Sequence, residues 1–164
     1  MDKVKKIMVA MAFTSHSEDL FKSAAQLAQL LNAELIIASI INSRDISAVR
    51  MVANMGYEID AEHYAEGIKT ERKELLEKLM AKSAFDRKNM RTIFKIGNPT
   101  DELLKLIVKE NIDMIVMGVK GHSNLEHMLV GSVAEKLFRR SPVPVISFRD
   151  EESAERLRKK IESA

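Results

Sequence analysis

Four short apolar runs constrain the fold of this chain more than any other feature of its sequence. They cover residues 7–13, 35–41, 112–117 and 143–148. Hydrophobicity that is continuous rather than alternating predicts strands buried on both faces, as in a parallel sheet covered by helices. Residues 90–96 partly alternate between apolar and polar side chains, which predicts an edge strand with one face in water.

Amphipathic segments separate these runs and are predicted to be helices. Residues 17–31 carry leucine and alanine at helical spacing, with Ser17 as the expected N-cap. Residues 60–83 predict a long, charged helix. Its buried side is expected to hold Leu75, Leu76 and Leu79.

Three further helices are expected in the second half of the chain. Asn98 followed by Pro99 is a strong start signal, because Asn caps a helix and Pro fits its first position. Ser132 and Glu135 have the spacing of a capping box at the start of another helix. Residues 151–163 fit either a last short helix or a frayed tail.

The predicted order of elements is strand, helix, strand, helix, strand, helix, strand, helix, strand, followed by the helical tail. This alternation predicts an α/β fold with a doubly wound parallel sheet and right-handed crossovers. The chain has 164 residues, of which 46% are hydrophobic, so one sizeable core is expected. We expect a single domain over residues 1–149 and a C-terminal helical extension over 150–164.

Residues 42–57 do not fit this compact alternation. The segment is long for a connection, and it contains Met51, Val52 and Met55, so it is not a simple polar linker. One interpretation is a loop or helical turn that packs locally. The other is a mobile lid or a surface for a protein partner, because methionine makes adaptable contacts.

The composition excludes several kinds of protein. The absence of cysteine excludes disulfides, thiolate nucleophiles and cysteine-ligated metal centres. With 26 Lys and Arg against 24 Asp and Glu, and 5% aromatic residues, the chain lacks the basic, aromatic-rich surface of a nucleic-acid binder. The apolar run at 7–13 is far short of the roughly 20 residues that span a bilayer. We therefore expect a cytoplasmic protein with no membrane partner.

The segment from Gly118 to Ser132 is the most informative part of the sequence for function. It begins where the run 112–117 stops and ends where a helix is predicted to begin. Open α/β sheets bind ligands at the carboxyl ends of strands, where the strand order reverses. Gly118, Gly121 and Gly131 would let the backbone approach an anion, and the helix would offer N–H groups. The glycines alone would fit simple turns equally well, and their spacing matches neither the P-loop nor the Rossmann motif.

The pattern Gly118-x2-Gly121-x9-Gly131-Ser132 resembles the nucleotide loop of the universal stress protein family. Four further segments extend the resemblance over nearly the whole chain: 6–10, 111–118, 131–137 and 141–145. The resemblance implies a stress-response protein with a Rossmann-like, five-stranded parallel sheet in the order 3-2-1-4-5. It also implies a homodimer, commonly paired through the final strands, with an interface at Val143, Val145, Ile146, Ser147 and Phe148.

This loop pattern marks the ATP-binding branch of the family, so the resemblance implies ATP as ligand, with Mg²⁺ bound through the nucleotide. The residues implied to hold ribose and phosphates are Gly118, Gly121, Gly131, Ser132 and Val133. Ile40 would contact adenine through its backbone, and Ala10 and Met117 would line the pocket. Lys120 and His122 would either face a phosphate or lie in solvent.

One position departs from the family pattern. The family commonly places an acid near the end of the first strand, in a pattern like V-A-x-D-F-S, and Ala12 stands in its place here. A hydrogen bond with a charged group is worth roughly 1.5–3 kcal/mol, or about one to two decades in affinity. Nucleotide binding would then be weaker, altered in base preference or absent.

Three functions remain open from the sequence. The first is an ATP-binding regulatory protein that changes its dimer surface or partner affinity with occupancy. The second is a dimeric interaction protein with a degenerate or differently occupied pocket, in which residues 42–57 meet a protein partner. The third is an enzyme, but no residue near the loop is an obvious catalytic base, so at most a slow hydrolysis of ATP is expected.

Overall fold

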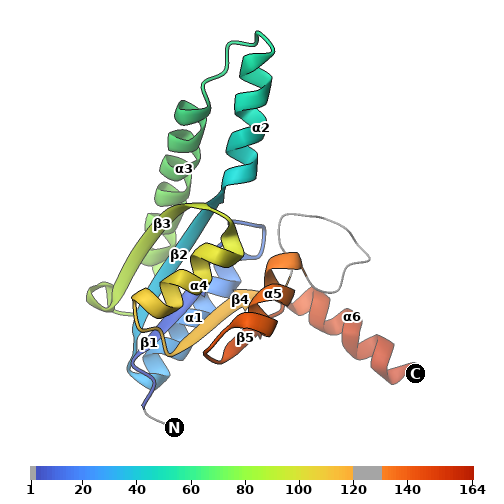
Figure 1. Cartoon of the computed structure of the whole chain (residues 1–164). Coiled ribbons are helices and arrows are strands. Elements are labelled where there is room, and N and C mark those ends of the chain that lie inside the picture. Colours follow the sequence, from blue (N-terminus) through green and yellow to red (C-terminus); the bar gives the residue numbers. More distant parts are fainter. Residues whose placement is uncertain (1–2, 120–130) are drawn as a thin grey trace.

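A five-stranded parallel sheet forms the centre of the computed structural model, which describes residues 3–119 and 131–164 (Figure 1). The strands lie in the order β3-β2-β1-β4-β5, which confirms the expected topology. Their bounds are β1 Lys6–Ala10, β2 Glu34–Asn42, β3 Met90–Gly97, β4 Met114–Gly118 and β5 Val145–Phe148. Because β1 pairs with both β2 and β4, the winding reverses beside β1, where a ligand crevice is expected.

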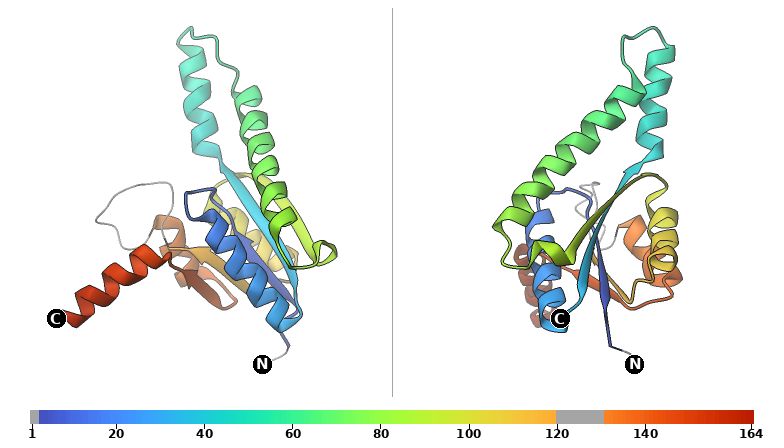
Figure 2. Two further views of the ribbon diagram at one scale, coloured as in Figure 1. Left: turned by 180° about the vertical axis from the view of Figure 1, so that it is seen from behind. Right: turned by 90° about the vertical axis from the view of Figure 1, so that its left-hand side faces the viewer.

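Six α-helices cover the sheet or extend from it in the described part of the chain. They are α1 Ser17–Leu31, α2 Ser43–Asn54, α3 Ala61–Lys82, α4 Pro99–Lys109, α5 Ser132–Arg140 and α6 Glu151–Glu162. Helices α1 and α3 lie on one face of the sheet, and α4 and α5 lie on the other (Figure 2). Helix α6 points away from the sheet.

Successive residues of the central strands pack into opposite cores. Ile7 and Val9 belong to the core beneath α1 and α3, whereas Met8 between them belongs to the core beneath α4 and α5. All three side chains are fully buried. This two-residue period is a property of every strand, so a strand with a core on each face must be apolar throughout. The prediction of strands buried on both faces is confirmed for β1, β2 and β4. For 143–148 it was wrong, because that run forms an edge strand that is exposed or partly exposed along its length, with Ile146 37% exposed.

Residues 42–57 contain a complete helix, where we expected a loop or helical turn. Asn42 is both the last residue of β2 and the N-cap of α2, because its side chain accepts a hydrogen bond from the backbone N–H of Arg44 at 3.0 Å. The interpretation as a loop or helical turn was therefore wrong, since the strand passes directly into the helix with no turn residue between them. Gly56, with φ of 97°, ends the helix and turns the chain toward α3.

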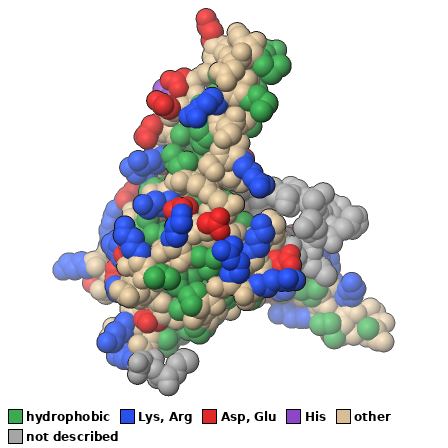
Figure 3. Space-filling view, viewed as in Figure 1, with side chains coloured by type: hydrophobic (Ala, Val, Ile, Leu, Met, Phe, Trp, Pro, Cys, Tyr) green, Lys and Arg blue, Asp and Glu red, His purple; other side chains and the backbone are tan. Residues whose placement is uncertain are grey.

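Helix α2 and the first part of α3 extend together beyond the sheet as a helical hairpin (Figures 1 and 2). A small apolar cluster joins the two helices to β2 through Ile41, Ile46, Ala61 and Ala65. Elsewhere the hairpin exposes large apolar side chains (Figure 3), including Met51 at 67% and Met55 at 73%. Among the described residues, no helix is both long and apolar enough to cross a membrane.

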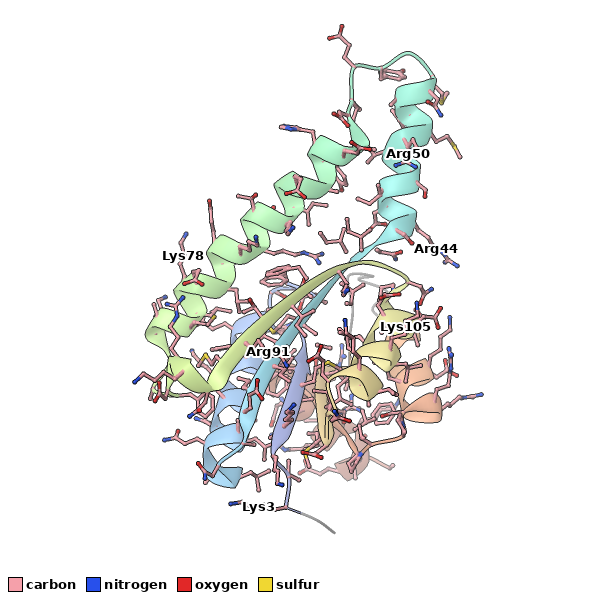
Figure 4. The ribbon with its side chains drawn as sticks, turned by 60° about the vertical axis from the view of Figure 1, so that its left-hand side comes forward. Lys3, Arg44, Arg50, Lys78, Arg91 and Lys105 are labelled. Atoms are coloured by element: carbon pink, nitrogen blue, oxygen red, sulfur yellow. The ribbon has the colours of Figure 1, made fainter. Side chains whose placement is uncertain are left out.

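The edge strands are more exposed than the central ones. Strand β3 is exposed or partly exposed along its whole length, as predicted for 90–96. Arg91 near its start forms ion pairs with Glu34 of β2 at 3.2 Å and with Glu110 after α4 at 2.8 Å (Figure 4). Strand β5 pairs with β4 and forms the other edge of the sheet.

Two predicted helix caps lie one residue from their expected positions. Helix α1 is capped by His16 and helix α5 by Gly131, so Ser17 and Ser132 are instead the first helical residues. The carbonyl of Gly131 already accepts the first intrahelical bond, from the N–H of Glu135 at 3.0 Å. The Ser132 hydroxyl therefore lies inside the first turn rather than at the capping position.

Candidate ligand-binding site

A cavity of about 690 Å³ opens at the carboxyl ends of β1, β2 and β4. This is the point where the winding reverses, and the volume falls within the range of small-molecule sites, about 300–1,000 Å³. Helix α3 and the end of β2 form one side, which we call the α3 side. The end of β4 and the start of α5 form the α5 side, and the residues after β5 close the rim.

The predicted nucleotide-binding residues that the structure describes all line this one cavity. They are Ala10, Ala12, Ile40, Met117, Gly118, Gly131, Ser132 and Val133. The remaining three, Lys120, Gly121 and His122, lie outside the described residues. The fold thus gathers at one edge of the sheet residues that are widely separated in the sequence.

The α5 side offers backbone groups. The N–H of Gly131 donates to the carbonyl of Val119 at 2.8 Å, so the residue directly after β4 is joined to the residue directly before α5. The first N–H groups of a helix have no partner within it, and they carry the positive end of the helix dipole. Ser132, Val133 and Ala134 supply such groups and line the cavity. This side therefore suits an anion such as a phosphate.

The turn after β1 reaches the cavity without a carboxylate. Ala12 contributes only a methyl group, and Phe13 adopts a left-handed φ of 55°, which is costly for a bulky residue. The centroid of the Phe13 ring lies 5.5 Å from the guanidinium carbon of Arg72. Phe13 is thus held where its ring faces a cation, an attractive arrangement.

Helix α3 lines the cavity with one face, formed by Tyr64, Ile68, Glu71, Arg72 and Leu75. The Nη1 atom of Arg72 donates to the hydroxyl of Ser39 at 3.0 Å and to the carbonyl of Ile40 at 3.2 Å. Burial lowers the pKa of Arg72, and the charge of Asp45 acts in the opposite direction. A partly buried cation is therefore fixed at the end of β2.

The α3 side of the cavity was not predicted from the sequence. Leu75 was expected on the buried side of α3, yet it is 42% exposed, whereas Leu76 beside it is 2% exposed. The spacing of Tyr64, Ile68, Arg72 and Leu75 does mark one face of a helix. However, the direction of that face is set by the packing of Leu76 into the core, which the sequence does not reveal.

The residues after β5 close the rim of the cavity. Asp150 caps α6, and its carboxylate accepts hydrogen bonds from the N–H and hydroxyl of Ser153 at 2.8 and 2.7 Å. Nε2 of His16 lies 3.9 Å from the same carboxylate. Burial raises the pKa of Asp150, but the bonds from Ser153 and the charge of His16 outweigh it, so the pKa is lowered. The segment 151–163 therefore begins as a capped helix, which favours the helical over the frayed interpretation.

Comparison with known proteins places the chain in a family. The sequence pattern of the Universal stress protein family matches residues 3–149. This chain belongs to that family. A protein of Staphylococcus aureus (strain USA300) named for the same family is 29% identical over 149 residues, which make up 90% of this universal stress protein and 86% of the relative.

Solved structures show the same fold. The hypothetical protein MJ0577 is 25% identical, with a TM-score of 0.74 over 92% of this chain and 99% of its own. The universal stress protein UspA from Lactobacillus plantarum is 20% identical, with a TM-score of 0.69 over 91% and 100% of the two chains. A universal stress protein in complex with cAMP is 23% identical, with a TM-score of 0.62 over 90% and 98%.

The described residues of this universal stress protein include no group of three His, Cys, Asp or Glu side chains placed to hold a metal ion. Asp113 precedes β4, at the end of the sheet opposite the cavity. Its carboxylate accepts hydrogen bonds from the backbone N–H groups of Lys5 and Lys6 at 2.8 and 2.9 Å. Its role is therefore to join β4 to the start of β1.

Proposed function

We propose that this universal stress protein binds a nucleotide in the cavity, with the phosphates at the start of α5. The observation that carries the proposal is the convergence, in one cavity, of the eight described residues that the family resemblance assigns to the nucleotide. The resemblance implies ATP. The related universal stress protein in complex with cAMP supports a nucleotide as the class of ligand.

The residues around the cavity would have distinct roles. The N–H groups of Ser132 and Val133 would donate to phosphate oxygens, and the Ser132 hydroxyl would add one more donor. Ala10 and Met117 would form an apolar floor beneath the ribose and base. Mg²⁺ would enter with the phosphates, because it keeps several of its waters and is commonly held through substrate phosphates.

Nucleotide occupancy would regulate a homodimer rather than support evolved catalysis. A second copy would pair with the outer edge of β5, through Val143, Val145, Ile146, Ser147 and Phe148. An edge strand presents unpaired backbone groups that such pairing would satisfy. Phe148 also lines the cavity, so the occupied pocket and the dimer surface would share this strand.

Two measurements on the whole chain test the nucleotide. Freshly purified protein is denatured and its released small molecules are identified by mass spectrometry, and Mg²⁺–ATP is titrated by calorimetry. Ser132→Pro then removes one N–H at the first helical position, where proline is tolerated. Gly131 before it has φ of −70° and ψ of 153°, which suits a residue preceding proline. We expect binding to weaken by about 10- to 150-fold, since a charge-assisted hydrogen bond is worth about 1.5–3 kcal/mol.

Ser132→Ala is the matched control, because it removes the hydroxyl and keeps the N–H. If Ser132→Pro binds as tightly as the unaltered protein, the phosphates do not lie at α5. A protein that is purified empty and ignores nucleotides at millimolar concentration would contradict the proposal. It would then favour the dimeric interaction protein, a second candidate motivated by Ala12 and by the apolar surface of the hairpin.

A further inference from the structure

The charged side chains that line the cavity are unevenly distributed. The α3 side, with the adjoining start of α2, carries the carboxylates of Asp45 and Glu71 together with the cation of Arg72. The rim carries two arginines, Arg149 directly after β5 and Arg156 in α6. Carboxylates repel phosphates and accept hydrogen bonds, so a nucleotide in this cavity would place its base toward α3 and its phosphates toward the rim.

The rim also holds the carboxylate of Asp150, but that group has partners of its own. It accepts two hydrogen bonds from Ser153 and lies 3.9 Å from Nε2 of His16. Two guanidinium groups against one carboxylate leave the rim with a net positive charge. Each guanidinium is always charged and offers five N–H donors and no acceptor, so the pair suits an anion.

Backbone hydrogen bonds place Arg149 near the start of α5. The carbonyl of Phe148 accepts from the N–H of Val119 at 3.3 Å, and the carbonyl of Val119 accepts from the N–H of Gly131 at 2.8 Å. Each of these two steps spans about 4.8 Å, as between adjacent strands, so the backbone of Arg149 lies roughly 10 Å from the start of α5. A chain of phosphates that begins at α5 would therefore lead toward Arg149.

The first turn of α6 directs Arg156 to the same rim. Ser153 is 7% exposed and donates two hydrogen bonds to Asp150, so this turn is fixed against the body of the protein. Residues three and four positions apart lie on one face of a helix, which puts Arg156 and Leu157 one turn beyond Ser153. All four residues line the cavity.

We propose that Arg149 and Arg156 form a subsite for the outer phosphates of a nucleoside triphosphate, so that the cavity selects nucleotides by their number of phosphates. This rests on the proposed function, because the N–H groups of α5 must hold the phosphate nearest the ribose. A guanidinium matches the oxygens of a phosphate and can donate two parallel hydrogen bonds to them. The family pattern matches residues 3–149, so Arg156 and α6 lie beyond it and the resemblance assigns them no role.

The first test compares ATP, ADP and AMP, each with Mg²⁺, by calorimetry on the whole chain. ATP should bind about 100-fold more tightly than AMP, since each arginine should contribute about tenfold. About tenfold is near the lower end of what a charge-assisted hydrogen bond is worth, because both arginines are exposed. The affinity for ADP should lie between the other two. Added salt should narrow the difference, since exposed charges are screened.

Substitutions then assign the preference to residues. Arg156→Gln should weaken the binding of ATP about tenfold and change that of AMP by less than about twofold. Arg149→Gln should do the same, and the double variant should bind ATP and AMP almost equally. Arg158→Gln is the matched control, because Arg158 of the same helix pairs with Glu151 and Glu155 and is not among the described residues that line the cavity. The ratio of ATP to AMP affinity should stay at its original value in this control.

Amide hydrogen exchange gives a second readout, which depends on contact with α6. A phosphate held by Arg156 would restrain this helix, so ATP should slow exchange over α6, whereas AMP should not. In Arg156→Gln, ATP should lose this effect. Exchange over α6 that ATP leaves unchanged in the unaltered protein would overturn the role of Arg156.

The outcomes separate this inference from the proposed function. AMP that binds the unaltered protein as tightly as ATP overturns the subsite and leaves nucleotide binding intact. Failure of all three nucleotides to bind overturns both. Equal losses for ATP and AMP in Arg156→Gln, or an equal loss of ATP affinity in Arg158→Gln, would show a general effect of charge and would also overturn the subsite. If circular dichroism shows that Arg149→Gln does not fold, Arg156→Gln and its control decide.

Discussion

The two sides of the cavity are built from different groups. On the α5 side they are backbone N–H groups of three consecutive residues, 132–134. On the α3 side they are side chains, and Arg72 reaches across 33 positions of sequence to Ser39. Backbone donors exist wherever a helix begins, but a side-chain donor is placed only by the packing of its helix. Single substitutions should therefore disturb the α3 side more than the α5 side.

The largest effect is expected where α3 is anchored. Leu76 is 2% exposed within the core beneath α1 and α3, so Leu76→Ala should lower the free energy of unfolding by about 2–5 kcal/mol. Urea denaturation measures this loss. Leu75→Ala is the control, because the adjacent side chain is 42% exposed, and it should cost less than about 1 kcal/mol. Equal losses would show that α3 is not held by its Leu76 face.

The next effect concerns Arg72 itself in the ligand-free protein. Arg72→Met removes the partner of the Ser39 hydroxyl, which belongs to a residue only 1% exposed. Leaving a buried polar group without a partner costs about 1–3 kcal/mol, which denaturant unfolding should show. Lys73→Met, on the exposed neighbour, should cost no more than about 1 kcal/mol. If Arg72→Met unfolds at the same denaturant concentration as the unaltered protein, the hydrogen bond from Arg72 to Ser39 does not contribute to stability.

A smaller effect is expected at the rim. Asp150→Ala removes the cap of α6 and should destabilise that helix by about 0.5–2 kcal/mol, seen as faster amide exchange over α6. The pKa of Asp150 is lower in the folded protein than in the unfolded chain. The stabilisation is therefore present above about pH 4 and is lost as the pH falls through the folded pKa. Asp150→Asn should keep the cap and remove this acid sensitivity, and acid sensitivity that persists in it would assign the effect to another group.

The smallest effect should come from the α5 side. The Ser132 hydroxyl does not cap α5, and the side chain is exposed, so Ser132→Ala should change the free energy of unfolding by no more than about 0.5 kcal/mol. Thermal and urea unfolding measure it. A loss above 1 kcal/mol would show that the hydroxyl supports the helix and would remove the contrast between the two sides.

The sheet and the α5 side could be predicted because their signals are local. Met8 had to be apolar because each residue of a central strand faces one of two cores. Asn98 caps α4 as expected, accepting from the N–H of Asp101 at 3.2 Å. The spacing of Gly118, Gly131 and Ser132 located the end of β4 and the start of α5 within a few residues.

The α3 side could not be predicted because its signals are not local. Arg72 lies in a helix with many charged residues, and only the burial of Leu76 and Met80 turns it toward the end of β2. Helix α2 was missed because Asn42 serves both strand and helix, which leaves no turn to mark the boundary. The same helix carries Asp45, which lines the cavity. Because 42–57 was predicted to be a loop or helical turn, this lining residue was not predicted either.

The methionines of the projecting hairpin are accessible to solvent, whereas those buried in the sheet region are not. Met51 and Met55 are 67% and 73% exposed, whereas Met8 and Met11 of the sheet region are 0% and 3% exposed. Oxidants convert accessible methionine to its sulfoxide, which is polar and which reductases can restore. Mild peroxide should therefore oxidise the methionines of the hairpin before it oxidises those buried in the sheet region. The hairpin would change from an apolar to a polar surface while the core that shapes the cavity stays reduced.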